Sequence, residues 1–304
     1  MTTDVPDLLR ELASRLASAG RESGAAEAAT IASHAAGISR GELAAAATLP
    51  DEVAERARAF AARRADTGEP LQYVLGQAVS GALDLAVGPG VFIPRPETEL
   101  LVDWVLRNLP APAPAAGESA EKAQVPVVID LCAGSGTIAL ELAHARPGIA
   151  VHAVELDPDA ATWLRRNAAA RAAAGDTPIR IAEADATDLD RLLEVFPELD
   201  GSASAVVSNP PYIPAAAEAE LPAEITAHEP ASALYGGPSG NDVIAGIVPV
   251  AARLLAPGGI CACEHDDATG DSVEALFEAH GGFVDVQRHR DLAGRPRFVT
   301  ARRG

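Results

Sequence analysis

Short apolar runs alternate with helix-like segments in the second half of the chain, and this alternation limits the folds available to it. The runs fall at residues 126–130, 150–155, 179–183, 204–208 and 259–264. Helical patterns lie between them, at about residues 137–146, 158–173, 187–196 and 240–255. Strands that alternate with helices pair in parallel, because each helix carries the chain back across the sheet. We therefore predict an α/β fold with a doubly wound sheet.

The segments on either side complete this predicted domain. A helix is expected at 97–109 and another near 271–280, followed by strands at 283–290 and 297–303. The short link between these two strands implies an antiparallel pair. Residues 110–124 are rich in alanine, proline and polar side chains, so we expect a flexible surface insertion there.

The first 75 residues have a different character and predict a small helical domain. Leu8, Leu9, Leu12 and Leu16 have helical spacing. Further helices are expected at 24–36, 40–47 and 50–66, with Pro50 in a first turn and no strand. Residues 71–76 and 83–87 look extended between glycines. We predict a helical domain at 1–75, a hairpin-like connector at 76–94 and a larger domain at 95–304.

Composition narrows the classes of partner. The 304 residues include 43 acidic and 24 basic side chains, for a net charge of −19. Such a charge argues against direct nucleic-acid binding and suits a basic protein surface. The polar N-terminus has no signal-peptide pattern and no apolar run is long enough to span a membrane, so we expect a cytoplasmic protein without a membrane partner.

The chain has three cysteines, which is an unsuitable number for a disulfide framework. Cys261 and Cys263 alternate along a predicted strand and should face the same side of it. Few ligands lie near them in the sequence, so we expect buried cysteines and no metal site.

A glycine loop follows the first strand of the larger domain. Its residues are Cys132, Ala133, Gly134, Ser135 and Gly136. The two glycines allow a tight turn and a close approach of the backbone to a ligand. Strand, glycine loop and helix in this order are typical of enzymes that bind dinucleotides or S-adenosylmethionine, so the loop alone leaves both open, along with a purely structural turn.

Acidic residues follow the next two strands. Glu155 ends the second strand, where a carboxylate can accept hydrogen bonds from both ribose hydroxyls of an adenosine. Asp157 precedes Pro158, so it is expected to cap the following helix. Asp185 and Ala186 follow the third strand and would lie along the adenine, although a solvated loop aspartate fits the same position.

The fourth strand ends in Asn209, Pro210, Pro211 and Tyr212. Two prolines cannot continue a parallel strand, so the chain must turn out of the sheet there. This corner offers an amide, a proline carbonyl and an aromatic face at the edge where α/β sheets bind ligands. Such a set can hold a flat, uncharged NH2 group by hydrogen bonds and stacking, whereas the simplest alternative is a proline-rich turn.

Together these loops resemble the class I S-adenosylmethionine-dependent methyltransferases that act on amino groups. Within that class, segments 69–76, 90–102 (which contains Ile93-Pro94-Arg95-Pro96-Glu97-Thr98-Glu99) and 228–237 resemble the release factor glutamine methyltransferase family, the PrmC/HemK family. The resemblance covers nearly the whole chain. It implies a seven-stranded sheet with the last strand antiparallel, next to a small N-terminal helical domain that positions a protein substrate.

The resemblance also implies an activity and a set of site residues. The expected reaction moves a methyl group from S-adenosylmethionine, leaving S-adenosylhomocysteine, to the glutamine amide nitrogen in the Gly-Gly-Gln motif of peptide-chain release factors. Asn209 and Tyr212 are the expected catalytic residues. The expected substrate contacts are Asn209, Pro210, Pro211 and Tyr212, and the expected cofactor contacts are Cys132, Ala133, Gly134, Ser135, Gly136, Glu155, Asp185, Ala186 and Asn209.

The chain departs from the family pattern in several places. Cys132 and Ala133 stand where the family often has Gly-Thr, Glu155 replaces the commoner aspartate, and residues 264–267 lack the usual Gly and Gln. Two rivals remain open: an adenine-amine nucleic-acid methyltransferase, which would need a basic cleft, and an NAD-dependent oxidoreductase, which the glycine loop permits.

Overall fold

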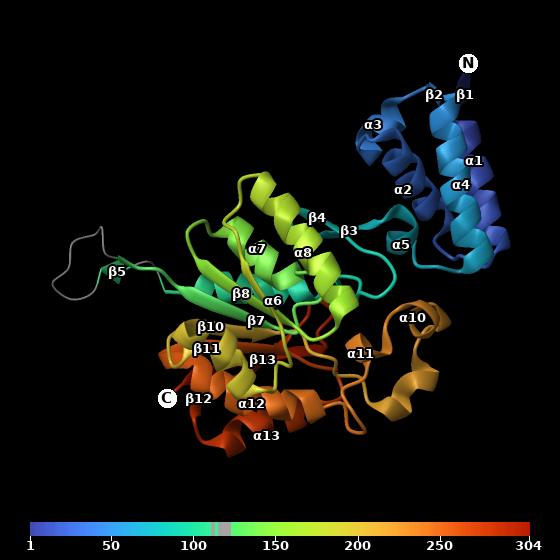
Figure 1. Cartoon of the computed structure of the whole chain (residues 1–304). Coiled ribbons are helices and arrows are strands. Elements are labelled where there is room, and N and C mark those ends of the chain that lie inside the picture. Colours follow the sequence, from blue (N-terminus) through green and yellow to red (C-terminus); the bar gives the residue numbers. More distant parts are fainter. Residues whose placement is uncertain (111–112, 115–122) are drawn as a thin grey trace. The chain divides into compact units, whose positions relative to one another are not determined.

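The computed structural model describes residues 1–110, 113–114 and 123–304 and divides the chain into two compact units (Figure 1). The first unit contains Met1–Gln77 together with Pro222–His228. The second contains Ala78–Leu221 and Glu229–Gly304. The sequence patterns do not predict that Pro222–His228, which lies far along the chain, belongs to the first unit.

The first unit is a small helical bundle. Its helices are α1 (Val5–Ser18), α2 (Gly24–Ala36), α3 (Arg40–Ala45), α4 (Asp51–Thr67), α5 (Leu71–Leu75) and α10 (Ala223–His228). Leu8, Leu12 and Leu16 are fully buried on one face of α1, as their spacing predicts. They share one core with Ile31 of α2 and Leu43 of α3, so the bundle is held by its apolar faces.

Two expectations for this unit are wrong. Leu71–Leu75 form helix α5 instead of an extended segment, because Pro70 suits a helix entry and Gly76, at φ 73°, provides a left-handed end. A strand pair is also present, since β1 (Thr2–Asp4) pairs antiparallel with β2 (Thr48–Pro50). Each of these strands has three residues, too few for strand alternation to be visible in the sequence.

A seven-stranded sheet forms the centre of the second unit, in the order β12-β13-β11-β10-β7-β8-β9. The strands are β7 (Val127–Leu131), β8 (Ala150–Glu155), β9 (Arg180–Glu183), β10 (Ala203–Ser208), β11 (Leu255–Glu264), β12 (Phe283–Arg290) and β13 (Pro296–Arg303). The pairs from β11 through β10, β7 and β8 to β9 are parallel. Strand β13 lies antiparallel between β11 and β12. The predicted doubly wound sheet with an antiparallel last strand is confirmed.

The helices of this unit lie close to their predicted ranges. They are α6 (Thr98–Asn108), α7 (Thr137–Ala145), α8 (Pro158–Ala173), α9 (Leu189–Val195), α12 (Asp242–Leu254) and α13 (Gly270–His280). The sequence analysis did not predict three short elements. They are helix α11 (Ala231–Leu234) and the 3₁₀ helices Pro197–Leu199 and Ala215–Glu220. Helical periodicity cannot be recognised over so few residues.

Two small strand pairs complete the description. Strands β3 (Gln77–Ser80) and β4 (Leu83–Ala86) form a two-stranded sheet, with Gly81 at positive φ between them. Strands β5 (Ala113–Pro114) and β6 (Ala123–Gln124) pair antiparallel. The rest of the predicted flexible insertion, residues 111–112 and 115–122, lies outside the described residues.

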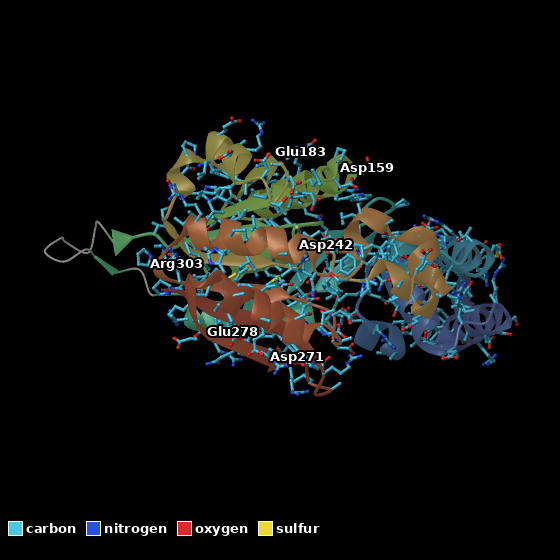
Figure 2. The ribbon with its side chains drawn as sticks, turned by 90° about the horizontal axis from the view of Figure 1, so that it is seen from below. Asp159, Glu183, Asp242, Asp271, Glu278 and Arg303 are labelled. Carbon is cyan, nitrogen blue, oxygen red and sulfur yellow. The ribbon has the colours of Figure 1, made fainter. Side chains whose placement is uncertain are left out.

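Acidic side chains lie around the outside of the second unit. Figure 2 marks exposed examples on several elements: Asp159, Glu183, Asp242, Asp271 and Glu278. Their spread matches the strongly negative net charge of the chain. Among the described residues, no helix combines the length and apolar character that crossing a bilayer requires.

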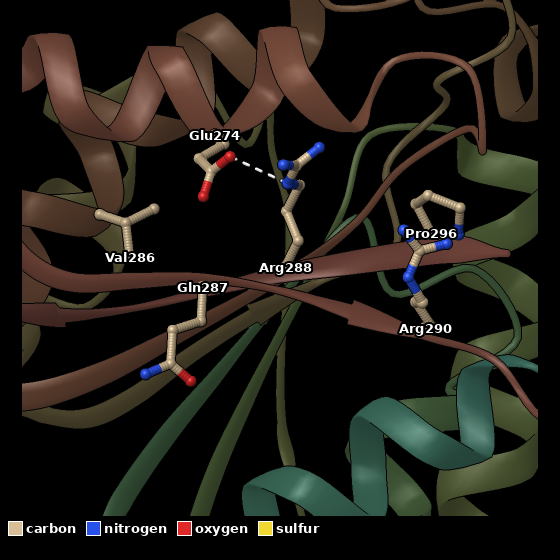
Figure 3. A pocket seen from close by; sticks show the side chains of 6 residues that line it. All are labelled: Glu274, Val286, Gln287, Arg288, Arg290 and Pro296. Carbon is tan, nitrogen blue, oxygen red and sulfur yellow. Dashed lines mark ion pairs between the residues drawn. The ribbon is translucent and has the colours of Figure 1, made fainter. Parts of the chain in front are cut away.

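A surface pocket lies on the edge of the sheet (Figure 3). Its lining residues are Glu274, Val286, Gln287, Arg288, Arg290 and Pro296. Arg288 Nε pairs with Glu274 Oε2 at 2.9 Å, which joins β12 to α13. Because β13, β11 and β10 separate β12 from β7, this pocket is distinct from the glycine loop that follows β7.

A buried ion cluster ties α10 into the helical unit. The Arg64 side chain is 6% exposed and forms two hydrogen bonds to the Glu27 carboxylate, at 2.8 and 3.0 Å. Burial opposes ionisation of Glu27, but Arg64 outweighs it, so the pKa of Glu27 lies below its ordinary value. Glu224 of α10 accepts from Arg64 at 2.7 Å and from Arg21 at 3.0 Å. These charges hold a distant piece of chain in place.

Replacing Arg64 by methionine should destabilise the protein, because it leaves the buried Glu27 carboxylate without its cationic hydrogen-bond partner. We expect a loss of about 3 kcal/mol in the free energy of unfolding, measured by urea denaturation followed by circular dichroism. Arg15→Met is the matched control, since Arg15 pairs with Asp66 on the surface and should cost less than about 1 kcal/mol. Equal losses in the two variants would contradict this account.

Candidate active site

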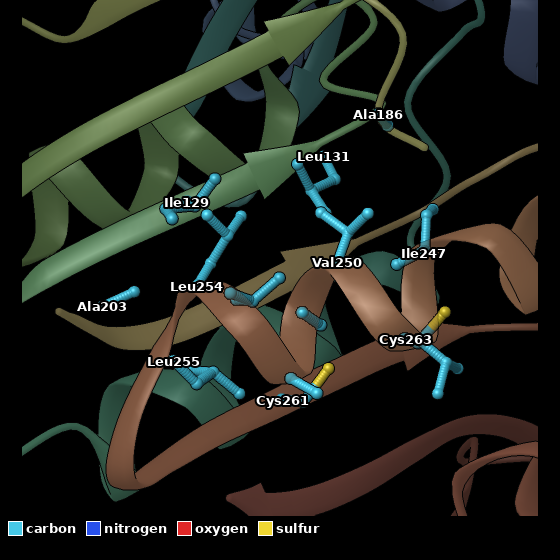
Figure 4. Close-up of a cluster of buried hydrophobic side chains, with 14 of the residues drawn as sticks. Ile129, Leu131, Ala186, Ala203, Ile247, Val250, Leu254, Leu255, Cys261 and Cys263 are labelled. Carbon is cyan, nitrogen blue, oxygen red and sulfur yellow. The ribbon is translucent and has the colours of Figure 1, made fainter. Parts of the chain in front are cut away.

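The carboxyl ends of the central strands lie side by side and carry every loop of the candidate site. Leu131 of β7 pairs with Val154 of β8 and with Ser208 of β10. Ser208 pairs in turn with Cys263 of β11. The core beneath these ends includes Leu131, Cys261 and Cys263 (Figure 4). The prediction that both cysteines are buried on one side of their strand is confirmed. The strand ends therefore pack against a continuous apolar core.

The glycine loop has the geometry that its glycines allow. Gly136 has φ 93°, which residues with a side chain rarely adopt, and a Cβ on it would also lie 2.7 Å from Leu164 Cδ1 of α8. Gly134 has φ 57°, and a Cβ there would meet nothing within 4 Å, so its backbone faces open space. Cys132 also has a positive φ, of 65°, at a cost of about 1–2 kcal/mol for a residue with a side chain.

Asp130 supports this loop from inside the core, a role that the sequence analysis missed. Its Oδ2 accepts a hydrogen bond from the Ala139 N–H at 3.0 Å, while Oδ1 has no partner among the described residues. Burial raises the pKa of Asp130 to about 8, despite the Ala139 hydrogen bond, and the nearby Glu155 charge adds to the rise. A largely protonated Asp130 therefore links β7 to the first turn of α7.

Glu155 lies directly against the glycine loop. Its Oε2 accepts from the Gly134 N–H at 2.7 Å, and its Oε1 accepts from the Asp157 N–H at 2.8 Å. Burial raises the pKa of Glu155, and the backbone hydrogen bonds oppose that rise. Each carboxylate oxygen can accept more than one hydrogen bond, so both retain capacity for hydroxyl donors.

The other two predicted acids have different environments. Asp157 caps α8, accepting from the Asp159 N–H at 2.9 Å, so the predicted capping role is confirmed. Asp185 is exposed and accepts from the N–H and hydroxyl of Thr187, at 2.8 and 2.7 Å. Ala186 is buried in the core below. The structure thus joins Glu155 to the glycine loop and places Asp185 in a local turn of its own.

The Asn209 corner is held by residues from distant parts of the chain. Asn209 Nδ2 donates to Thr98 Oγ1 at 3.1 Å, and Thr98 Oγ1 donates to Glu264 Oε2 at 2.8 Å. Asn209 Oδ1 has no donor among the described residues and is not one of the fully buried unpaired atoms. It is therefore free to accept an N–H from a ligand.

Tyr212 connects to the same carboxylate. Its hydroxyl donates to Glu264 Oε1 at 2.9 Å, so one buried side chain links the two predicted catalytic residues. Burial raises the pKa of Glu264, while the Thr98 and Tyr212 hydrogen bonds and the Arg297 charge oppose that rise. The sequence analysis missed Thr98 and Glu264 as site residues, although Thr98 lies in a segment that carries the family resemblance.

A second buried carboxylate holds the segment before α6. Glu229, whose side chain is 1% exposed, pairs with Arg95 and accepts from the Ile93 N–H at 3.2 Å. The Arg95 guanidinium lies 4.6 Å from the centre of the Phe92 ring. The segment that follows Tyr212 is therefore fastened to the proline-rich segment that leads into Thr98.

Glycines let the chain pack closely behind the corner. A Cβ on Gly236 would lie 2.5 Å from the Pro211 oxygen and 2.4 Å from the Gly240 oxygen. A Cβ on Gly240, which has φ 80°, would lie 2.3 Å from the Tyr212 oxygen. The hydrogen bond from Gly236 N–H to the Ile213 oxygen, 3.0 Å long, fixes the two segments together. Backbone atoms, which cannot rotate away, therefore back the corner.

Replacing Gly236 by alanine should displace the corner, because the new methyl group would overlap two carbonyl oxygens. We expect at least a 10-fold loss of activity, and a visible shift of residues 209–212 in a crystal structure of the variant. Gly41→Ala is the control: it lies in helix α3 with the nearest atom 3.9 Å from the new methyl group, and it should leave activity unchanged. An unmoved corner in the Gly236 variant would count against this packing.

Comparison with known families agrees with this architecture. The PrmC N-terminal domain model matches residues 7–76, and the methyltransferase small domain model matches residues 118–234. One relative of the chain, at 38% identity over 92% of this chain and 90% of its own length, is the 4-amino-L-phenylalanine/4-methylamino-L-phenylalanine methyltransferase of Streptomyces pristinaespiralis. Methyl transfer is therefore the chemistry named both by the second family model and by this relative.

Two relatives with greater identity carry one name, release factor glutamine methyltransferase. That of Mycolicibacterium smegmatis is 45% identical, over 95% of this chain and 94% of its own length. That of Streptomyces coelicolor is 41% identical, over 97% of this chain and 98% of its own length. At this identity and coverage, the chain belongs to the release factor glutamine methyltransferase family.

Proposed function

We propose that this protein transfers a methyl group from S-adenosylmethionine to the side-chain amide nitrogen of the glutamine in the Gly-Gly-Gln motif of peptide-chain release factors. The observation that supports this most is the Asn209 amide just after β10: its Nδ2 is bonded to Thr98, and its Oδ1 has no donor among the described residues, one position before Pro210. Two hydrogen-bond acceptors on a stiff corner match the two N–H groups of a carboxamide. The family relationship supports the choice of a release factor.

The residues around the glycine loop fit S-adenosylmethionine. Open space over Gly134 leaves room for a ligand close to the backbone, and the Glu155 carboxylate beside it can accept from ribose hydroxyls. The rest of the loop, with Asp185 and Ala186 after β9, would line the adenosine. The cofactor supplies an activated methyl group on its sulfonium, so the protein needs no metal for this chemistry.

The corner would raise the reactivity of a poor nucleophile. An amide nitrogen is unreactive because its lone pair is delocalised into the carbonyl group. Asn209 Oδ1 and the Pro210 carbonyl would accept hydrogen bonds from its two N–H groups, which increases electron density on nitrogen. The N–CH3 bond would form as the S–CH3 bond of the sulfonium breaks, and one N–H proton would then be released to water. Such contacts strengthen as positive charge develops, so they favour the transition state over the ground state. The Tyr212 ring, with its hydroxyl held by Glu264, would pack against the amide plane.

The helical unit would position the protein substrate, and Pro222–His228 would take part because it belongs to the same unit. Exposed acidic residues would suit a basic partner surface and disfavour a direct nucleic-acid substrate. We place the reaction in the cytoplasm, as translation termination requires. A small aromatic amine is the second candidate substrate, because one relative is named for that reaction and its NH2 also lies on an sp2 carbon.

Mass spectrometry would test the proposal directly. A purified release factor incubated with this protein and S-adenosylmethionine should gain one methyl group on its Gly-Gly-Gln glutamine. Asn209→Ala should be slower by about 100-fold, by analogy with the loss of one transition-state hydrogen bond. 4-Amino-L-phenylalanine assayed in parallel distinguishes the second candidate. Methylation of the amino acid alone, or of neither compound, would overturn the assignment.

The raised pKa of Glu155 predicts that cofactor affinity depends on pH. Ribose hydroxyls would donate to the ionised carboxylate, so binding would lower the pKa of Glu155, and affinity must rise with pH and fall as the group becomes protonated. Calorimetry with S-adenosylhomocysteine over a series of pH values should show weaker binding at the acid end. Glu155→Gln should bind weakly with little pH dependence; equal slopes in both proteins would exclude this role.

A further inference from the structure

A hydrogen-bonded chain of three side chains runs from the core to the Asn209 corner. Its members are Glu264 at the end of β11, Thr98 at the start of α6, and Asn209 after β10. Thr98 and Glu264 are each 1% exposed, so water does not supply alternative partners for them. No proposed step of the reaction touches either residue, yet both are bonded in series to a group that does.

The direction of this chain follows from counting protons. An ionised carboxylate only accepts hydrogen bonds, so the single proton of the Thr98 hydroxyl must point at Glu264 Oε2, 2.8 Å away. The Thr98 oxygen can then only accept, and the Asn209 atom 3.1 Å from it must be the NH2 nitrogen. The amide oxygen of Asn209 is consequently turned to the other side.

The surroundings of Glu264 act on its ionisation in both directions. Burial, the largest influence, favours the protonated form, and the Glu97 charge before α6 adds to this. The Thr98 and Tyr212 hydrogen bonds and the positive charge of Arg297 on β13 favour the ionised form. A proton on Oε1 would still leave Oε2 to accept from Thr98. Only a proton on Oε2 would reverse the chain, so the direction does not depend on full ionisation.

We propose that Glu264, acting through Thr98, is a positioning residue that fixes which face of the Asn209 amide meets the substrate. With the amide flipped, NH2 would face the two N–H groups of an incoming carboxamide and repel them. The proposal rests on the proposed function for the identity of that carboxamide. It adds a requirement on the enzyme itself: the acceptor is oriented before any substrate arrives, which reduces the cost of binding the transition state.

Thr98→Val tests this inference, because valine keeps the shape of threonine and removes its acceptor. We expect kcat on a release factor to fall about 10-fold or more, since the amide would lose its preferred orientation, with an unchanged Kd for S-adenosylhomocysteine. Thr98→Ser keeps the hydroxyl and should restore most of the lost rate. A Thr98→Val protein as fast as the unmodified enzyme would overturn the inference.

A double-mutant cycle separates positioning from general structure. If Thr98 acts through Asn209, Thr98→Val should cause no further loss in an Asn209→Ala background, whereas an independent structural effect would add to it. Additive losses would therefore refute the proposed route.

Neutron crystal structures, which distinguish the amide NH2 from the amide oxygen, give a readout that needs no turnover. In Thr98→Val the Asn209 amide should leave its original orientation, and in Thr98→Ser it should keep it. If the unmodified protein methylated no release factor but the amide moved as expected, the proposed function would fail and the positioning role would stand. An unmoved amide in Thr98→Val would overturn the positioning role even if methylation is observed.

Discussion

Three buried carboxylates at the ends of three strands organise the loops of the site. Asp130 at the end of β7 holds the first turn of α7, Glu155 at the end of β8 holds the glycine loop, and Glu264 at the end of β11 holds Thr98 and Tyr212. Burial raises the pKa of all three. Burying a carboxyl group costs free energy unless hydrogen-bond donors surround it. Each of these three acids therefore fixes the position of the loop that supplies its donors.

The arrangement divides the work between backbone and side chains. Around Gly134 and Gly136 the backbone itself forms the surface, because both residues have positive φ values that favour glycine. At the Asn209 corner, the side chains of Asn209 and Tyr212 stand beside the backbone of the two prolines, and glycines behind it let two backbone segments touch. At the carboxyl ends of the strands, the glycine loop therefore presents backbone atoms, and the Asn209 corner presents polar groups.

Most of the fold could be predicted from the sequence because apolar spacing encodes strands and long helices directly. The seven-stranded sheet and the capping role of Asp157 follow from such local patterns. Helix α5 and the short helices after Tyr212 were missed because each has too few residues to show a helical period in the sequence. The Glu264 cluster was missed for another reason: its bonds join residues 166 and 52 positions apart, and only the folded chain brings them together.

The membership of Pro222–His228 in the helical unit affects how the protein can be dissected. Glu224 finds its cationic partners, Arg64 and Arg21, on a stretch of chain far upstream. Cutting the polypeptide after Gln77 would separate α10 from both of these arginines. The Glu224 carboxylate would then have no cationic partner. The helical unit is therefore discontinuous in sequence, and a fragment that ends at Gln77 would lack one of its pieces.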